Sequence, residues 1–325
     1  MPDPADSAAV DLRATTAWIE GIPRGTVRAS GAGASAFVEK FTTAAIADMR
    51  PGAGREGFFA DARGWVLALA TLLRQDDGLL IDCDAATAET LRAHLEHYHI
   101  REDVSFTDET PGVDCFLVAG PDAASLLAAA SVGELPSQAL GHSRIDIGGV
   151  AAHVVAIDWL HVAGFLVRVP RDQANVIGVA FAAAGLPQAP HAAFETLRIE
   201  SRFPLACDIP AKMLPQELDR ASRAISFTKG CYLGQETVAR IDALGHVNRT
   251  LALVAIAGER QPGTDVAVTR NGEVVGTLTS TTLSPRLGPC GIGILNRRAF
   301  EPTAVLEVDG HRVRLVAAGS ASRPG

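Results

Sequence analysis

Lysine and tyrosine are scarce in this chain. Of its 29 lysines and arginines, only Lys40, Lys212 and Lys229 are lysines, and Tyr98 and Tyr232 are its two tyrosines. Basic charge is also in deficit, because 37 aspartates and glutamates give a formal net charge of −8. Broad binding to nucleic acid or to anionic membranes needs a basic surface. We therefore expect neither as a partner.

The cysteines lack the spacing of a self-contained metal site. There are five of them, and no two form a C-x-x-C pair. Structural zinc sites and four-cysteine clusters usually use such close pairs, and disulfide frameworks are typical of small secreted chains. His94 and His97 would share a helix face, but no second pair completes a site, and we expect a solvated helix end. We predict no metal site; a cluster held here would need ligands from a partner or a small molecule.

Targeting and membrane signals are also missing from the sequence. The first residues are polar and acidic, without the basic and apolar regions of a signal peptide. The longest apolar run, Trp65–Leu73, is about half of a membrane span. No phosphate-binding P-loop, nucleophile elbow or H-E-x-x-H motif occurs. We expect a soluble, cytoplasmic protein.

What the sequence does contain is a unit that occurs twice. A strand predicted at Gly25–Ser30 leads through Gly31 into a helix, and a strand predicted at Cys115–Ala119 leads through Gly120 into another. In both copies a hairpin, a further strand and a longer helix follow. Chance similarity between alanine-rich helices is the alternative. Strands and helices that each bury one face predict an α+β fold in which helices cover sheets.

The C-terminal part has the pattern of short β-strands. The pairs Asn271-Gly272 and Asp309-Gly310 predict two-residue hairpin turns between them, and together the runs predict a small antiparallel barrel. Near the other end, a short helix is expected around Ala14–Ile19. The predicted organisation is a lead-in at 1–24, a region at 25–245 with two repeats (about 25–110 and 115–186) and a motif segment at 191–245, and the barrel at 246–319.

The rare residue types meet in one stretch, K-G-C-Y-L-G-Q-E, at Lys229–Glu236. Thr228 is a suitable N-cap for a helix running from about Lys229 to Ala243. Cys231 would then lie in the first turn, beside a lysine and near the positive end of the helix dipole. Both effects favour the thiolate, so we predict an activated thiol. A buried structural cysteine in a glycine-rich turn is the alternative.

The longer stretch F-T-K-G-C-Y-L-G-Q-E-T-V-A-R-I, Phe227–Ile241, resembles the signature of the YgfZ-type folate-binding proteins. These are relatives of the glycine-cleavage T-protein, GcvT, that assist iron–sulfur cluster maturation. Leu197–Glu200, Val247–Arg249 and Gly276–Ser280 resemble further segments of that family. The resemblance covers most of the chain. It implies a three-lobed fold around a central folate channel, with the two repeats and the barrel as lobes.

The resemblance also implies roles for individual residues. Cys231 and Lys229 are expected to carry the chemistry, and Glu200 to bind the pterin ring, because a carboxylate can accept from two adjacent N–H donors. Arg198 and Arg240 are candidates for the folate tail or for framing the pocket; a solvated helix face is an even alternative for Arg198. The implied cofactor is tetrahydrofolate or a one-carbon-substituted folate. The folate contacts implied are Arg198, Glu200, Lys229, Tyr232, Gly234, Gln235 and Arg240.

One stretch departs from the enzymes of the wider family. T-protein enzymes carry acidic residues after a glycine pair in the first repeat, where this chain reads G-W-V-L-A-L at Gly64–Leu69. Without a carboxylate, transfer chemistry loses its general base. Three functions stay open: an accessory protein for iron–sulfur assembly that acts through transient partner or client proteins, with Cys231 as its thiol; a folate-dependent aminomethyltransferase-type one-carbon transferase; and a non-catalytic folate-binding scaffold.

Overall fold

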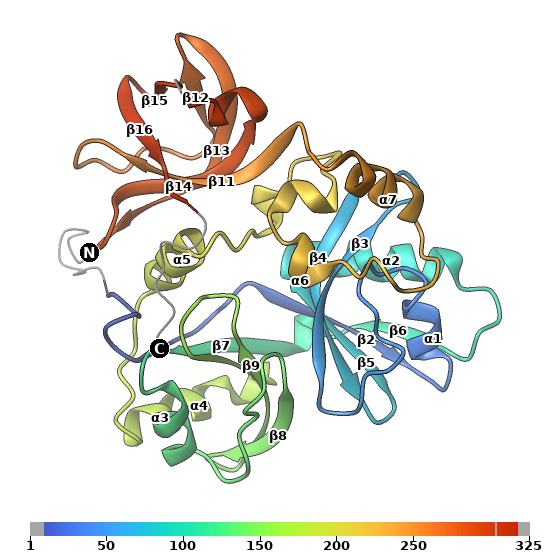
Figure 1. The fold of residues 1–325 in the computed structure, drawn as a ribbon. Helices are drawn as coiled ribbons and strands as arrows, with labels where there is room; N and C mark the ends of the chain where they lie inside the picture. The colour runs from blue at the N-terminus through green and yellow to red at the C-terminus, as the bar shows by residue number, and fades with distance from the viewer. Residues whose placement is uncertain (1–9, 303, 318–325) are drawn as a thin grey trace.

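The computed structural model describes residues 10–302 and 304–317 and has three lobes. Figure 1 shows two lobes built on sheets, at the right and at the bottom, and a β-barrel at the top. Each sheet has five strands, and the barrel is closed by six. The predicted α+β class with a C-terminal antiparallel barrel is confirmed. No helix in the two described ranges is long and apolar enough to cross a membrane.

The first lobe contains the sheet β3-β4-β5-β2-β6, with α1 and α2 on one face. Along β2, Val27 and Ala29 point to the helices and are fully buried, as the two-residue period of a strand requires. The elements of this lobe are β2 (Arg24–Ser30), α1 (Ala34–Val38), β3 (Gly54–Ala60), β4 (Val66–Gln75), β5 (Gly78–Asp84), η1 (Ala85–Thr87), α2 (Ala88–Tyr98), β6 (Ser105–Asp108) and η2 (Thr110–Gly112).

The second lobe repeats this plan in the order β8-β9-β10-β7-β1, with α3 and α4 on its outer face. Because β7, β8, β9 and β10 take the places of β2, β3, β4 and β5, the duplication predicted from the sequence is confirmed. The elements are β7 (Val113–Ala119), α3 (Ala123–Ala129), β8 (His142–Ile147), β9 (Val150–Ile157), β10 (Gly164–Pro170), η3 (Arg171–Gln173) and α4 (Ala174–Ala183).

The fifth strand of the second sheet comes from the N-terminal segment. β1 (Ala17–Ile19) pairs with β7, so the helix expected around Ala14–Ile19 is wrong. The physical reason is burial on two sides. Trp18 packs against Phe116 and Phe181 on the helix side, whereas Ile19 faces the core between the lobes.

The two sheets are joined by a buried carboxylate. Asp82 of β5 accepts from Arg24 of β2 at 2.9 Å and also forms an ion pair with Arg168 of β10. The three side chains are at most 5% exposed. Asp82 and Arg168 stand at equivalent places in the two repeats, each two residues after the matching Leu80 and Leu166. The pseudo-symmetry of the lobes therefore brings opposite charges together.

The barrel follows the order β11-β14-β13-β12-β15-β16. Both predicted tight turns are confirmed: Asn271 and Gly272 have φ angles of 51° and 80°, and Asp309 and Gly310 have 49° and 77°. Two positive φ angles in succession are the signature of a type I′ hairpin. The barrel elements are β11 (Arg249–Ile256), β12 (Val266–Arg270), β13 (Glu273–Ser284), β14 (Gly288–Asn296), η6 (Arg297–Phe300), β15 (Leu306–Val308) and β16 (His311–Leu315).

Short helices connect the second sheet to the barrel. The first, α5, lies below the barrel in Figure 1, and the last, α7, lies at the upper right. These elements are α5 (His191–Glu200), η4 (Ala206–Asp208), η5 (Pro215–Leu218), α6 (Ala221–Ala224) and α7 (Gln235–Leu244).

Replacement of Asp82 by asparagine is expected to destabilise the fold by about 3–5 kcal/mol, because two buried guanidinium groups lose their shared carboxylate. The free energy of unfolding in urea, followed by circular dichroism, measures this loss. Glu89→Gln is the matched control, because Glu89 forms an exposed ion pair with Arg92, and its unfolding midpoint should stay near that of the wild type. Equal midpoints for the two variants would contradict the assignment.

The same carboxylate predicts a pH dependence. Burial alone would raise the pKa of Asp82, but Arg168 and Arg24 together lower it below its ordinary value. The ionised form therefore stabilises the fold fully above the unfolded-state pKa of about 3.9, and this contribution is lost as the pH falls below it. The acid side of the stability profile should be flatter in Asp82→Asn than in the wild type.

Candidate functional site

The K-G-C-Y-L-G-Q-E motif is a loop followed by a helix. Helix α7 begins at Gln235, and its N-cap is Gly234, with a left-handed φ of 82°. A Cβ at Gly234 would lie 2.6 Å from the carbonyl oxygen of Asp61, so only glycine fits. The predicted helix from Lys229, with Thr228 as its N-cap, is therefore wrong. Cys231 lies before the helix, where the dipole argument does not apply.

Lys229 anchors this loop to the first lobe. Its side chain is 1% exposed. The ammonium donates to the backbone carbonyls of Glu39, Thr42 and Ala44 at 2.7, 2.8 and 2.7 Å, and the Glu39 carboxylate lies 3.3 Å away. Burial lowers the pKa of Lys229, although Glu39 opposes that effect. Because all three protons of the ammonium have carbonyl acceptors, this lysine fixes the position of the loop.

Cys231 is exposed and is a free thiol. The residues on both sides of it are held: Lys229 as described, and Leu233 through a backbone hydrogen bond to Lys40 at 2.8 Å. Tyr232 is buried, with the Lys229 ammonium 5.2 Å from its ring centre, and burial raises the pKa of Tyr232 to about 12. The alternative of a buried structural cysteine is excluded. The backbone of the loop is therefore held in place on both sides of Cys231, while the thiol itself is exposed to solvent.

The other motif residues position α7. Gly64 turns with a φ of 83° beneath the helix, and a Cβ there would meet Thr237. Gln235 forms the first turn, with its backbone N–H 3.2 Å from the carbonyl of Tyr232. Arg240 is exposed on α7 and has no ion pair among the described residues. The folate contacts implied for Tyr232, Gly234, Gln235 and Arg240 stay predictions.

Glu200 ends α5 at the junction of three segments. Its carboxylate pairs with Arg13 of the lead-in at 2.9 Å and with Arg286 of the barrel at 3.0 Å, and it accepts from the Ser284 hydroxyl. The side chain is 5% exposed. A pterin bound by Glu200 would have to displace some of these contacts. The predicted pterin role stays a prediction.

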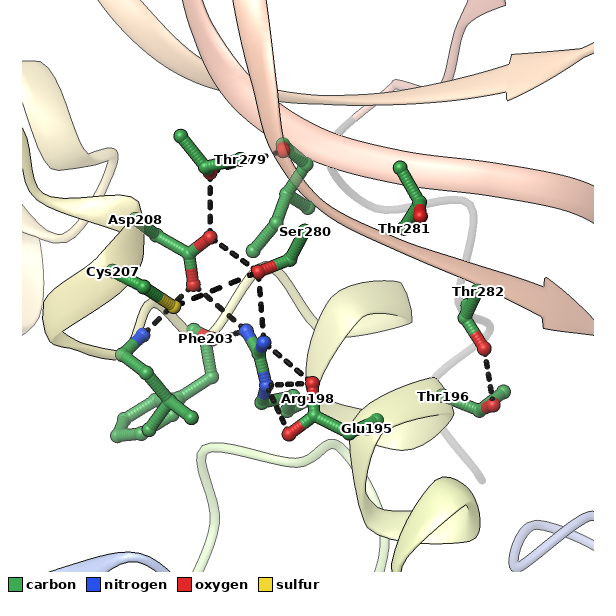
Figure 2. A network of polar contacts seen from close by, with 12 residues as sticks. Glu195, Thr196, Arg198, Phe203, Cys207, Asp208, Thr279, Ser280, Thr281 and Thr282 are labelled. Carbon is green, nitrogen blue, oxygen red and sulfur yellow. Dashed lines mark hydrogen bonds and ion pairs between the residues drawn. The ribbon is translucent and has the colours of Figure 1, made fainter. Parts of the chain in front are cut away.

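Arg198 lies at the centre of a second network, which Figure 2 shows in detail. Its guanidinium donates to Glu195 of the same helix, to Asp208 of η4 at 2.8 Å and to Ser280 of β13 at 2.9 Å. The side chain is 2% exposed, so the alternative of a solvated helix face is wrong. Asp208 also accepts from Ser280, so the network docks the barrel against α5.

The predicted site residues therefore form two groups on different elements. Lys229, Cys231 and Tyr232 belong to the loop fastened to the first lobe, whereas Arg198 and Glu200 belong to α5 beneath the barrel. Figure 1 shows α7 and α5 on separate sides of the central region. The structure does not bring the thiol into the network of Glu200.

A buried aromatic pair between these groups was missed by the sequence reasoning. Trp159 and Phe203 stack with ring centres 3.9 Å apart, and the Arg24 guanidinium lies 6.0 and 5.7 Å from them. The indole N–H of Trp159 has no hydrogen-bond partner in the described part of the chain. The only sequence signal was the scarcity of tryptophan, which occurs three times.

A small cavity lies beside this pair. It has a volume of about 60 Å³ and is lined by Arg24, Asp84, Val66–Leu69 and Pro204–Ala206, among others. Four residues of the G-W-V-L-A-L stretch thus line this cavity, together with a segment that follows Glu200 in the chain. Small-molecule pockets usually measure roughly 300–1,000 Å³, so a folate bound at this cavity requires its lining to move apart.

Comparison with known proteins relates the chain to one family. The family described as "GCVT N-terminal domain" matches residues 7–229. A putative chloroplastic transferase of Arabidopsis thaliana is 26% identical over 283 residues, which are 85% of this chain; the match spans 64% of that relative's length. An aminomethyltransferase of Streptomyces avermitilis is 24% identical and covers 89% of this chain and 84% of its own.

A tRNA-modifying protein YgfZ of Colwellia psychrerythraea is 26% identical over 235 residues, with 70% of this chain and 68% of the relative covered. Among solved structures, the glycine cleavage system aminomethyltransferase T of Bartonella henselae superposes with a TM-score of 0.83. It covers 96% of this chain and 88% of its own at 17% identity. The likeness extends over all three lobes and concerns the fold.

Thiol labelling of the native protein is expected to modify Cys231 first. Cys207 should react more slowly, because burial and Asp208 raise the pKa of its thiol. Cys83, Cys115 and Cys290 should react only after unfolding, since burial raises the pKa of each to about 12. Iodoacetamide labelling at pH 8 with peptide mapping measures the order. Labelling of a buried cysteine before Cys231 would contradict the structure.

Replacement of Lys229 by methionine should cost about 1–3 kcal/mol of stability, because buried carbonyl acceptors lose their donor. The amides of Ser226 and Leu233, which bond to Thr43 and Lys40, should then exchange faster with deuterium. Lys40→Met is the matched control, because the Lys40 side chain is exposed. Unchanged exchange of these amides in Lys229→Met would show that the ammonium does not hold the loop.

Proposed function

The chain belongs to the GCVT N-terminal domain family, and on this basis we propose that it is a tetrahydrofolate-binding accessory protein for iron–sulfur cluster assembly or repair. Cys231 is the working thiol in this proposal. One observation carries it: the motif loop is fixed by the buried Lys229 ammonium, yet its cysteine is exposed and free. A cysteine kept only for packing would be buried.

The proposed chemistry of Cys231 is that of one ligand among several. The thiolate, not the thiol, binds iron, so Cys231 loses a proton when it takes up a cluster. Cys83, Cys115 and Cys290 are buried, and no group of three or more potential metal ligands occurs among the described side chains. The remaining ligands are therefore assigned to a partner protein, with which the accessory protein associates transiently.

The proposal assigns folate to the centre of the molecule. Glu200 exchanges its contacts with Arg13 or Arg286 for the pterin, and the cavity beside Val66–Leu69 widens to admit the ring. The bound species is tetrahydrofolate or a one-carbon-substituted derivative. Family membership supports this assignment, and the similarity to a YgfZ protein supports the link to an accessory role.

An aminomethyltransferase is the second candidate function. It is favoured by the nearly full-length similarity to the Streptomyces enzyme. Against it stands the absence of a carboxylate in Gly64–Leu69. The cavity does contain Asp84, but its two oxygens accept from the backbone N–H groups of Ala86 and Ala206 at 2.8 Å each. A carboxylate committed in this way is a poor general base.

The decisive experiment combines calorimetry with complementation. The wild type should bind tetrahydrofolate, and Cys231→Ala should bind it equally but fail to restore iron–sulfur enzyme activity in a strain that lacks the gene. Cys207→Ala, the matched control with the other exposed thiol, should restore it. Glu200→Gln should weaken folate binding by roughly tenfold, because a charged hydrogen bond contributes about 1.5–3 kcal/mol.

Each of the three candidate functions has an experimental outcome that excludes it. If Cys231→Ala restores the iron–sulfur enzyme activity of the strain, the protein is a folate-binding scaffold that does not need this thiol. Production of methylenetetrahydrofolate from an aminomethylated carrier protein would establish the transferase instead. Absence of folate binding to the wild type would remove all three readings together.

A further inference from the structure

A second cavity lies on the far side of the Asp82 ion pairs, where the two sheets meet. It has a volume of about 190 Å³. Strands of both lobes line it, with Thr26 and Arg28 from β2, Leu80 from β5, and Arg144, Ala151, His153 and Arg168 from β8, β9 and β10. Buried residues form its floor, whereas Arg144 and Ala151 at its rim are exposed. The cavity is therefore open to solvent at one end and walled by cations.

The charges around this cavity do not balance. Glu109 lies in the wall, but its carboxylate is paired with Arg28. Arg144 has no ion pair among the described residues. Arg168 shares one carboxylate, that of Asp82, with Arg24. One buried negative charge thus faces two buried positive ones, and an uncompensated buried charge destabilises a fold.

The buried guanidinium also has unused donors. Arg168 is 5% exposed, and its Nε and Nη1 atoms have no hydrogen-bond acceptor in the described structure. Its Nη2 contacts Asp82. Buried N–H groups are nearly always satisfied, and an arginine fork fits the paired oxygens of a carboxylate or phosphate. A negatively charged acceptor would satisfy these donors.

The neighbouring histidine adds no charge of its own. Burial and Arg168 lower the pKa of His153 to about 2, so it is neutral at ordinary pH. Its Nε2 lies 3.1 Å from Nδ1 of His142, and its own Nδ1 has no partner among the described residues. The floor of the cavity thus contains two side chains whose hydrogen bonding is incomplete.

We propose that this cavity binds a small metabolite oxyanion, a carboxylate or a phosphate group, between Arg168 at its floor and Arg144 at its rim. The anion accepts from the free donors of Arg168 and supplies the negative charge that the junction of the sheets lacks. The site is separate from the proposed folate centre, since the Asp82 ion pairs lie between them. It does not depend on the function proposed above.

Titration calorimetry of the full chain with inorganic phosphate and with succinate tests the proposal, at constant ionic strength because surface charges are screened by salt. At least one of the two should bind saturably and raise the thermal unfolding midpoint. Binding of phosphate alone would identify a phosphate site, and binding of succinate alone a carboxylate site; either supports the proposal. Absence of saturable binding for both would overturn it.

Two variants distinguish anion binding in this cavity from nonspecific electrostatic attraction of anions to the protein surface. Arg144→Glu, at an exposed position that should not affect folding, is expected to weaken binding at least about tenfold, the loss of one charged hydrogen bond. Arg260→Glu in the barrel, exposed and without an ion pair in the described ranges, should change the affinity less than about twofold. Equal losses in both variants would overturn the proposal. Folate binding by Arg144→Glu should equal that of the wild type.

Discussion

The carboxylate of Asp82 decides how the two sheets of this protein lie against each other. Apolar residues such as Leu80 and Leu166 also pack between the sheets, but apolar surfaces alone do not determine a unique register. A buried carboxylate that reaches Arg24 in its own sheet and Arg168 in the other permits few relative positions. Removal of three charged groups from water is costly. We infer that the gain is the precise alignment of the lobes.

This alignment has consequences on both sides of the ion pairs. On one side, Arg24 lies over the stacked Trp159 and Phe203 and lines the small cavity beside Val66–Leu69. On the other side, the second arginine leaves an excess of buried positive charge beneath the cavity of Arg144. The repetition of the sheet-and-helix unit explains the arrangement. Equivalent positions of the two repeats face each other, and the opposite charges of Asp82 and Arg168 there form an ion pair.

The barrel and the motif loop depend on separate anchors of a similar kind. Arg198 joins α5 to Asp208 and Ser280 and so docks the barrel, as Figure 2 shows. Lys229 joins the motif loop to three carbonyl groups of the first lobe. In both cases a buried cation satisfies acceptors on distant segments. Arg198 and Lys229 therefore serve assembly, and within the motif the exposed side chains with reactive or charged groups are Cys231 and Glu236.

The sequence by itself determined the periodic features. Alternating burial, tight-turn dipeptides and the repeated strand–glycine–helix pattern predicted both repeats and the barrel, because these signals depend on neighbours within a few residues. Only the tertiary structure decided the rest. The residues at 17–19 form a strand because the edge of β7 is available to pair with them. Helix α7 does not begin before Gly234, because this glycine turns with a left-handed φ against the carbonyl of Asp61. The roles of Arg198, Lys229 and Asp82 depend on partners many residues away in the chain, and a pairing over such a distance leaves no local pattern in the sequence.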